Sequence, residues 1–189
     1  MKTYFYDKFQ KNRLDRIFSL LGKEWFEGKD ILELGAAHGD IGSKLIELGS
    51  DVSFSDIRKE FLKEILKKHP HSNTNIYKID QNLPYDLNKT FDLILHLGVL
   101  YHLENWEEDL KNALNHTNLL ILESIIYPYL KDPSLVFNIE STNTSPYISF
   151  NKRYKEIDEN SLIKCFNNLN VKYLRIDTPN MSTPFVFDY

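Results

Sequence analysis

Short apolar segments alternate with segments of helical periodicity along most of the chain, and this alternation restricts the possible folds more than any other feature. The segments with the pattern of buried strands are 30–34, 52–55, 75–80, 91–97 and 118–124. Helices are predicted between and around them, at 7–26, 40–48, 58–68, 104–115 and 159–168. Strands that alternate with helices in this way form a mostly parallel sheet covered by helices on both faces. The sequence therefore predicts a doubly wound α/β fold.

Two more strands are expected near the end of the chain, at 171–176 and 183–188. The turn-forming sequence "DTPN" lies between them and is short enough for a hairpin, so the last strand should run antiparallel. The expected sheet thus has seven strands. With 189 residues, 42% of them hydrophobic, the chain can bury one core. We expect a single domain, 1–189, with an N-terminal helical segment at 1–28 and an irregular, aromatic-rich segment at 125–157.

Charge and cysteine content narrow the classes of partner. The chain has 23 Lys and Arg against 27 Asp and Glu, a net charge of −4, which disfavours binding to nucleic-acid phosphates. The single cysteine, Cys165, excludes an intramolecular disulfide and a cysteine-based metal cluster. No signal segment and no run of roughly 20 apolar residues is present. These features predict a cytoplasmic protein with no membrane partner.

Polar residues and glycines follow the first four predicted strands. In an open parallel sheet, ligands bind beyond the carboxyl ends of the strands, where the strand order reverses. A ligand site is therefore expected at these strand ends, which carry Glu33 and Gly35, Asp56, Asp80 and Gln81, and His96 and Gly98.

The segment after the first strand, "GAAHGDIG" at 35–42, departs from the dinucleotide-binding pattern G-x-G-x-x-G. Read from Gly35, the second and third glycines of that pattern would be Ala37 and Asp40. An aspartate at a helix N-terminus repels a pyrophosphate, so a cofactor without phosphate is favoured. An alanine fits position 37 if its backbone φ angle is negative.

"ILELGAAHGDIG" at 31–42 resembles the first motif of the class I S-adenosylmethionine-dependent methyltransferases, E/D-x-G-x-G-x-G. Glu33, Gly35 and Gly39 match this motif and Ala37 departs from it. "VSFSDI" and "YKIDQN" are similar to the second and third motifs of the family, and "FDLILHLGVLYHL" is similar to its fourth-strand segment. The resemblance covers about residues 28–124, in the right order and spacing, and implies S-adenosylmethionine as the cofactor.

The resemblance also implies which residues bind this cofactor. The glycines at 35 and 39 would let the backbone pass close to the methionine moiety. Asp56 would accept hydrogen bonds from the ribose hydroxyls, and Asp80 would accept one from the adenine amine. The cofactor-binding residues so implied are Glu33, Gly35, Ala36, Ala37, Gly39, Asp56, Ile57, Asp80, Gln81, His96 and Leu97.

Methyl transfer from a sulfonium needs a base only where the acceptor must lose a proton. Candidate catalytic residues are His96, His102 and Tyr101, because a histidine titrates near neutral pH. His102 and Tyr101 could instead have structural roles. His102 could cap the following helix or pack before it, and Tyr101 could lie in the hydrophobic core. No metal site is expected, since Glu123 is the only carboxylate at the fourth and fifth strand ends.

The acceptor is restricted mainly by motifs that the chain lacks. It has no Asn/Asp-Pro-Pro-Tyr/Phe motif, which adenine methyltransferases carry. Cytosine-C5 methyltransferases need a nucleophilic cysteine, but the single cysteine, Cys165, lies in a predicted amphipathic helix and is expected to be a buried apolar residue. A small-molecule, glycan or metabolite acceptor is therefore favoured, with O-methylation. Candidate substrate residues are Glu123, Tyr127 and Arg153, the last two in the aromatic-rich segment. Two alternatives remain: a methyl- or carboxymethyl-transferring enzyme that modifies tRNA, and an inactive cofactor-binding protein that acts through residues 7–26 or the aromatic segment.

Overall fold

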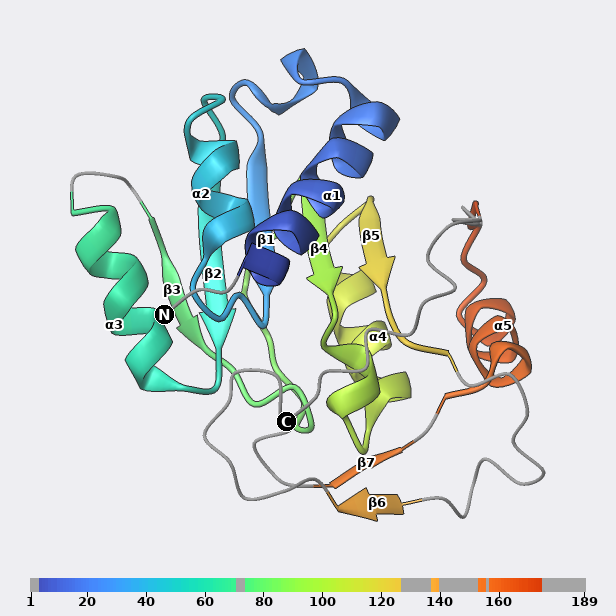
Figure 1. Cartoon of the computed structure of the whole chain (residues 1–189). Helices are drawn as coiled ribbons and strands as arrows, with labels where there is room; N and C mark the ends of the chain where they lie inside the picture. The colour runs from blue at the N-terminus through green and yellow to red at the C-terminus, as the bar shows by residue number, and fades with distance from the viewer. Residues whose placement is uncertain (1–3, 71–73, 127–136, 140–152, 156, 175–189) are drawn as a thin grey trace.

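The computed structural model describes residues 4–70, 74–126, 137–139, 153–155 and 157–174 (Figure 1). Its main sheet has five strands in the order β3-β2-β1-β4-β5, and all four pairings are parallel. The five strands predicted for the main part of the chain are thereby confirmed, with ends that differ by a few residues. They are β1 (Asp30–Leu34), β2 (Asp51–Asp56), β3 (Ile76–Lys78), β4 (Leu93–Leu97) and β5 (Leu120–Glu123).

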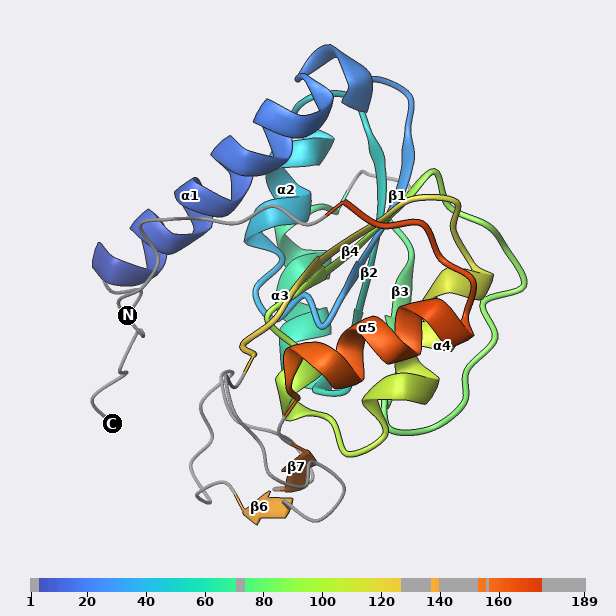
Figure 2. The ribbon, with the colours of Figure 1, turned by 90° about the vertical axis from the view of Figure 1, so that its right-hand side faces the viewer.

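Helices cover both faces of the sheet, as predicted for a doubly wound fold. Figure 2 shows α1, α2 and α3 on one face and α4 and α5 on the other. The helix predicted at 7–26 is divided, because α1 ends before Gly22 and a 3₁₀ helix follows. The helices are α1 (Tyr4–Leu21), η1 (Glu24–Phe26), α2 (Asp40–Ile46), α3 (Lys59–Lys68), η2 (Leu100–His102), α4 (Trp106–Asn115) and α5 (Glu159–Asn168).

The hydrophobic core forms two layers because successive residues of a strand point to opposite faces of the sheet. Ile31, Phe54 and Leu95 pack on the side of α1, α2 and α3. Leu34 and Ile94 face the opposite side, where α4 and α5 add a cluster around Trp106, Leu110 and Leu162. None of the helices among the described residues is both long and apolar enough to cross a lipid bilayer.

Strand order reverses between β1 and β4. These two strands are neighbours in the sheet, with Leu34 paired to His96, although β2 and β3 lie between them in the sequence. From β1 the chain builds the sheet outward through β2 and β3, and from β4 it continues on the other side to β5. The carboxyl ends of β1 and β4 therefore form the switch point at which a ligand crevice is expected.

The prediction of a seven-stranded sheet is corrected by the structure. Residues 171–174 form no strand; they follow α5, and the Tyr173 ring lies 5.1 Å from the Phe166 ring. Residues 175–189, which include the predicted last strand, lie outside the described residues. The segment predicted as irregular at 125–157 contains two short strands, which form a separate antiparallel pair. They are β6 (Phe137–Ile139) and β7 (Arg153–Lys155).

Candidate functional site

The turn that follows β1 contains three residues with positive φ angles: 62° at Gly35, 45° at Ala37 and 66° at Gly39. The condition under which an alanine fits position 37 without strain, a negative φ, is therefore not met. The reason lies in β2, whose end holds the turn, since Ala36 N donates to Ser55 O over 2.8 Å. A left-handed conformation costs an alanine about 1–2 kcal/mol, so the surrounding contacts stabilise a strained residue here.

Asp56, at the end of β2, is the carboxylate that holds this turn. Only 4% of the residue is exposed. Its Oδ2 accepts a hydrogen bond from Ala37 N over 3.0 Å, and its Oδ1 accepts one from Arg58 N over 2.8 Å. Burial raises the pKa of Asp56, against the opposing effect of these amides. Each carboxylate oxygen has a second lone pair, so Asp56 can also accept from a ligand hydroxyl.

Glu33 lies beneath the turn, on the face of β1 that packs against α2. It is 5% exposed, and its Oε2 accepts a hydrogen bond from Gly42 N over 2.9 Å. Burial raises the pKa of Glu33 to about 8. A side chain at position 42 would contact this carboxyl group and the Phe54 ring. Glu33 therefore fixes the first turn of α2 against the sheet.

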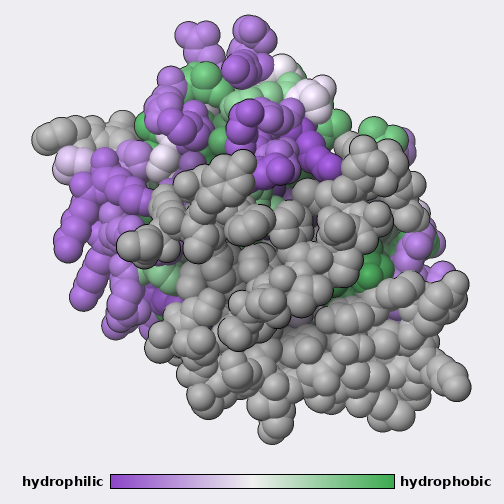
Figure 3. Space-filling view, viewed as in Figure 1, coloured by the Kyte–Doolittle hydropathy of each residue, from purple (hydrophilic) through white to green (hydrophobic). Residues whose placement is uncertain are grey.

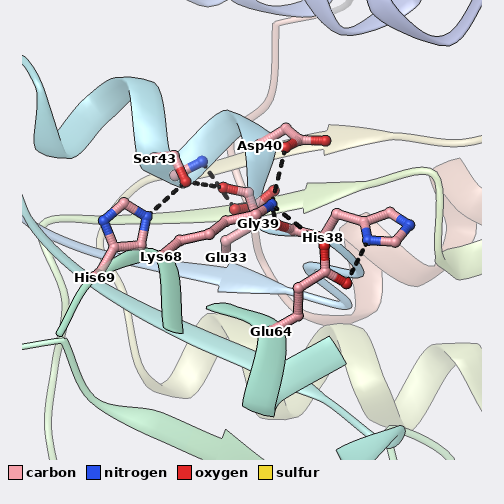
Figure 4. A network of polar contacts seen from close by, with 9 residues as sticks. Glu33, His38, Gly39, Asp40, Ser43, Glu64, Lys68 and His69 are labelled. Atoms are coloured by element: carbon pink, nitrogen blue, oxygen red, sulfur yellow. Dashed lines mark hydrogen bonds and ion pairs between the residues drawn. The ribbon is translucent and has the colours of Figure 1, made fainter. Parts of the chain in front are cut away.

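Lys68 and Glu64, on α3, hold the turn from the other side (Figure 4). Lys68 Nζ donates to His38 O over 2.6 Å and lies 3.3 Å from Asp40 Oδ1. His38 Nδ1 lies 3.0 Å from Glu64 Oε2. Lys68 therefore contacts the turn from α3. Hydrophilic side chains gather over α3 in Figure 3, and the exposed lysines of that helix include Lys59, Lys63 and Lys67.

Ser43 extends this polar network along α2. Its Oγ donates to Gly39 O over 2.6 Å and lies 2.7 Å from His69 Nε2. Because the serine proton is used by the carbonyl group, His69 Nε2 is the donor in the second contact. Burial lowers the pKa of His69. The network therefore connects the turn to both α2 and α3.

The end of β3 is followed by a loop that is attached to the start of α4. Asp80 Oδ1 accepts a hydrogen bond from Asn82 N over 3.0 Å. Asn82 Oδ1 in turn accepts from Glu104 N over 2.8 Å and from Asn105 N over 3.2 Å. This arrangement places Asp80 at the strand ends, half-buried.

His96, on β4, is completely buried and points to α4. Its Nε2 lies 2.6 Å from Asp109 Oδ2, and both residues are 0% exposed. Asp109 is also the partner of Gln81 and Tyr85. The sequence interpretation missed Asp109 and Tyr85. The signal for Asp109 was its spacing: it lies on the same helical face as Trp106, Leu110 and Ala113, where an apolar residue is expected.

A glycine also follows β4. Gly98 has a φ of 71°, and the Arg13 guanidinium of α1 lies against it, in the space that a side chain at 98 would occupy. Arg13 pairs with Glu123 of β5: its Nη2 lies 2.6 Å from Oε1, and its Nε lies 3.1 and 3.0 Å from the two oxygens. Arg13 was also missed, although it falls between Phe9 and Ile17 at four-residue spacing on the apolar face of α1.

The remaining predicted site residues fall into two groups. Ala36 and Leu97 are buried in the core on the α1 side, and Ile57 is half-buried after Asp56. Tyr101 and His102 are half-buried on η2, with ring centroids 4.2 Å apart. The backbone of η2 lies against β7, the strand that contains Arg153. Tyr127 lies outside the described residues.

Among the residues that the structure describes, no three His, Cys, Asp or Glu side chains are grouped so that they could hold a metal ion. Cys165 is a buried free thiol, and burial raises its pKa to about 11. A thiol with this pKa is a poor nucleophile at neutral pH.

Residues 32–119 match the model of a protein family described as "Methyltransferase domain". The matched region begins in β1 and ends just before β5, so it includes the switch point and all four predicted motif regions. This part of the chain, 88 of the 189 residues, is therefore similar to the methyltransferase domains of that family. A comparison with curated proteins found no match.

Solved structures with the same fold include several methyltransferases. The N-terminal domain of EvdMO1 with S-adenosylhomocysteine (SAH) bound has a TM-score of 0.70 at 20% identity, over 84% of this chain and 70% of that chain. Magnesium protoporphyrin IX methyltransferase (ChlM) from Synechocystis PCC 6803 with bound SAM has a TM-score of 0.63 at 16% identity, over 93% and 77% of the two chains. At these identities the likeness shows the Rossmann-like fold alone.

The residues at the switch point fit S-adenosylmethionine, the cofactor that the resemblance in the sequence implies. Asp56 and Asp80 supply acceptors for hydroxyl and amine protons. Gly35 and Gly98 carry no side chains at the ends of β1 and β4, and the space beside them is occupied by Val99 and Arg13. The acidic side chains at this edge suit a cationic sulfonium and disfavour a phosphate group. These carboxylate acceptors therefore fit an adenosyl cofactor that carries no phosphate.

Proposed function

We propose that this protein transfers a methyl group from S-adenosylmethionine to an oxygen of a small-molecule acceptor. The observation that supports this most directly is the pair of glycines, Gly35 and Gly98, that follow the adjacent strands β1 and β4. The carboxylates expected for adenosyl recognition, Asp56 and Asp80, lie beside β1 at the ends of β2 and β3, and η2, which follows Gly98, carries Tyr101 and His102.

In the proposal, the adenosine part is held from the ends of β2 and β3. Asp56 Oδ1 and Oδ2 keep their amide contacts and accept in addition from the ribose hydroxyls, because each oxygen accepts two hydrogen bonds. Asp80 Oδ1 is used by Asn82 N, so we assign its Oδ2 to the adenine amine. Gly35 and the neighbouring turn backbone face the methionine part. Glu33 acts indirectly, by fixing α2 and the turn.

We assign the methionine carboxylate to Arg13. Its guanidinium lies beside Gly98 and is only 11% exposed, while its partner Glu123 is 39% exposed. A planar guanidinium binds carboxylates through two parallel hydrogen bonds, and its outer edge can serve a second anion. Glu123 then holds Arg13 in place. This role replaces the predicted direct contact between Glu123 and the acceptor.

The cofactor supplies an electrophilic methyl group on a sulfonium. The chain's contribution is to align the acceptor oxygen with the sulfur and to exclude water. For an acceptor that loses a proton, His102 and Tyr101 are the candidate bases, since both lie on η2 after Gly98. His96 is 0% exposed with Asp109 on its Nε2, so we assign it a positioning role.

The acceptor site is proposed at the edge between η2 and β7. Arg153 lies on β7, and a cation there would suit an acceptor with a carboxylate. Tyr127 is kept as a candidate substrate residue. Two of the structural relatives support a small-molecule acceptor through their names, since one is a porphyrin methyltransferase and another was crystallised in the presence of SAH and D-fucose.

The proposal is tested by incubating the protein with S-adenosylmethionine labelled in its methyl group. The acceptor panel contains phenols, sugars, aliphatic and porphyrin carboxylates, amines and bulk tRNA. Label transferred to an oxygen of a small molecule is the expected result. Label transferred only to tRNA or to nitrogen would contradict it, and cofactor binding without transfer to any acceptor would favour the inactive, cofactor-binding alternative. Tyr101→Phe and His102→Gln then distinguish the two candidate bases.

A further inference from the structure

Asp109 is the centre of a buried polar cluster on the α4 side of the sheet. Its Oδ1 lies 3.2 Å from both Gln81 Nε2 and Tyr85 Oη, and its Oδ2 lies 2.6 Å from His96 Nε2 and 3.2 Å from Gln81 Nε2. Three side chains thus point their donors at one carboxylate. Within the described part of the chain, His96 is the one basic side chain in an ion-pair contact with Asp109.

The carboxylate fixes the orientation of the Gln81 amide. An ionised carboxylate only accepts hydrogen bonds, so Gln81 must turn its NH₂ group toward Asp109. Its Oε1 is then directed the other way, and it lies 3.4 Å from the position that a Cβ would occupy on Gly35. Gln81 is 8% exposed, so its amide has little freedom to turn. The acceptor end of Gln81 therefore faces the first residue of the turn after β1.

The same carboxylate selects the tautomer of His96. Nε2 must carry a proton to donate to Asp109, which leaves Nδ1 as an acceptor in the neutral ring. This Nδ1 is completely buried and has no hydrogen-bond partner among the described residues. Burying an imidazole nitrogen in this way is unfavourable. The cluster is therefore more polar than packing of α4 on the sheet requires.

The loop that carries Gln81 is attached to the helix that carries Asp109. Besides the two amide contacts to its side chain, Asn82 accepts a hydrogen bond at its main-chain oxygen from Asn105 Nδ2 over 2.9 Å. Asn105 immediately precedes α4. The end of β3 and the first turns of α4 are thus connected at their surface by Asn82 and in their interior by Asp109.

We propose that Asp109 is a positioning residue for the cofactor: through Gln81 it fixes the polar groups between Gly35 and the end of β3, against which the cofactor is held. This inference rests on the proposed function, which holds the adenosine part from the ends of β2 and β3 and the methionine part at Gly35. Asp109 acts through Gln81 and does not contact the cofactor. Tyr85 donates to the same carboxylate, and we assign it a contribution to stability alone.

The test measures SAH affinity by calorimetry and thermal stability in four variants: Asp109→Asn, Gln81→Met, the double variant, and Tyr85→Phe. Asparagine presents an NH₂ group where the donors point, so it cannot hold Gln81 as the carboxylate does. We expect Asp109→Asn and Gln81→Met each to weaken SAH binding at least tenfold. The double variant should be no more than threefold weaker than the weaker single variant, because both changes remove one shared contact.

Tyr85→Phe is the matched control, because it removes a donor to Asp109 without touching Gln81. It should lower thermal stability and leave SAH affinity within twofold of wild type. The inference is overturned if Asp109→Asn binds SAH within twofold of wild type, or if the losses multiply in the double variant. If Asp109→Asn does not fold, the SAH affinity of Gln81→Met is the deciding measurement. An affinity equal to that of the wild type overturns the inference. A tenfold loss in Gln81→Met, with the affinity of Tyr85→Phe unchanged, supports it. Absence of SAH binding in the wild type would instead overturn the proposed function.

Discussion

The backbone amide of Ala37 donates to Oδ2 of Asp56 over 3.0 Å, and Ala37 makes this contact with a φ of 45°. A glycine would adopt this angle without strain, and the family motif has a glycine at this position. The chain instead relies on the carboxylate at the end of β2 to hold an alanine in the left-handed region. The geometry of the turn and the proposed binding of the ribose thus depend on the same side chain, that of Asp56.

Replacing Ala37 by glycine should stabilise the protein. Removing the strain of the left-handed alanine gains about 1–2 kcal/mol, and the greater freedom of glycine in the unfolded chain offsets about 0.4–1 kcal/mol. A net gain of about 0.5–1 kcal/mol in the free energy of unfolding is expected from urea denaturation. Ala36→Gly is the control, since Ala36 is buried and does not have a positive φ; it should destabilise. Equal effects of the two substitutions would contradict the strain argument.

Glu33 should make stability decrease as pH rises. Its pKa is raised to about 8 by burial, so the folded state holds a proton that the unfolded chain releases near pH 4.5. Stability from this group is fully present below about pH 4.5 and is lost progressively up to about pH 8, by at most about 1.4 kcal/mol per pH unit. Asp56 shifts in the same direction. Glu33→Gln should therefore show a flatter denaturation profile between pH 5 and 8. Parallel profiles for the two proteins would refute this assignment.

Lys68 should support cofactor binding although it lies on α3. Its Nζ holds the His38 carbonyl group and Asp40, so Lys68→Met loosens the turn without touching the proposed ligand contacts. We expect SAH affinity to fall about three- to tenfold and stability to fall by about 1 kcal/mol. Lys63→Met, on the exposed side of the same helix, should change neither quantity. Similar losses in both variants would indicate a general charge effect.

Arg13 and Glu123 should respond differently to substitution. The pair is partly exposed, so a double-mutant cycle on stability should give a coupling of about 1 kcal/mol or less. Arg13→Met should weaken SAH binding at least tenfold, because it removes the proposed partner of the methionine carboxylate. Glu123→Gln should keep the affinity within about threefold, since the amide oxygen can still accept from Arg13. The opposite order of effects would show that Glu123 is the ligand residue.

Much of the fold was predictable because the five parallel strands and their helices have clear hydrophobic periods. Residues 159–168 show this best, since Asp158 caps the helix and the predicted bounds are those of α5. The strand predicted at 171–176 failed at residues 171–174, where Lys172, Tyr173 and Leu174 are exposed. An alternating apolar pattern predicts a strand only where a neighbouring strand edge is there to pair with it.

The candidate site was predictable at the strand ends and not beyond them. The order of the parallel strands determines which strand ends lie side by side. It therefore also determines the surroundings of Gly35, Asp56 and Gln81, which lie at or just after strand ends. Arg13 and Asp109 come from helices, and their roles depend on where each helix packs. A charged residue on an apolar helical face is a useful signal in both cases, but the sequence does not identify its partner. The positive φ of Ala37 could not be read from the sequence for the same reason, because its contact with Asp56 is tertiary.

The central claim is that the ends of β1 and β2 hold S-adenosylmethionine through the turn and Asp56. Calorimetric titration with SAH tests it most directly, using wild type and Asp56→Ala, with circular dichroism to check that both are folded. The account predicts saturable binding of one SAH per chain in the wild type and at least a tenfold loss of affinity in Asp56→Ala. No heat at high micromolar SAH, or equal affinity in the two proteins, would contradict it.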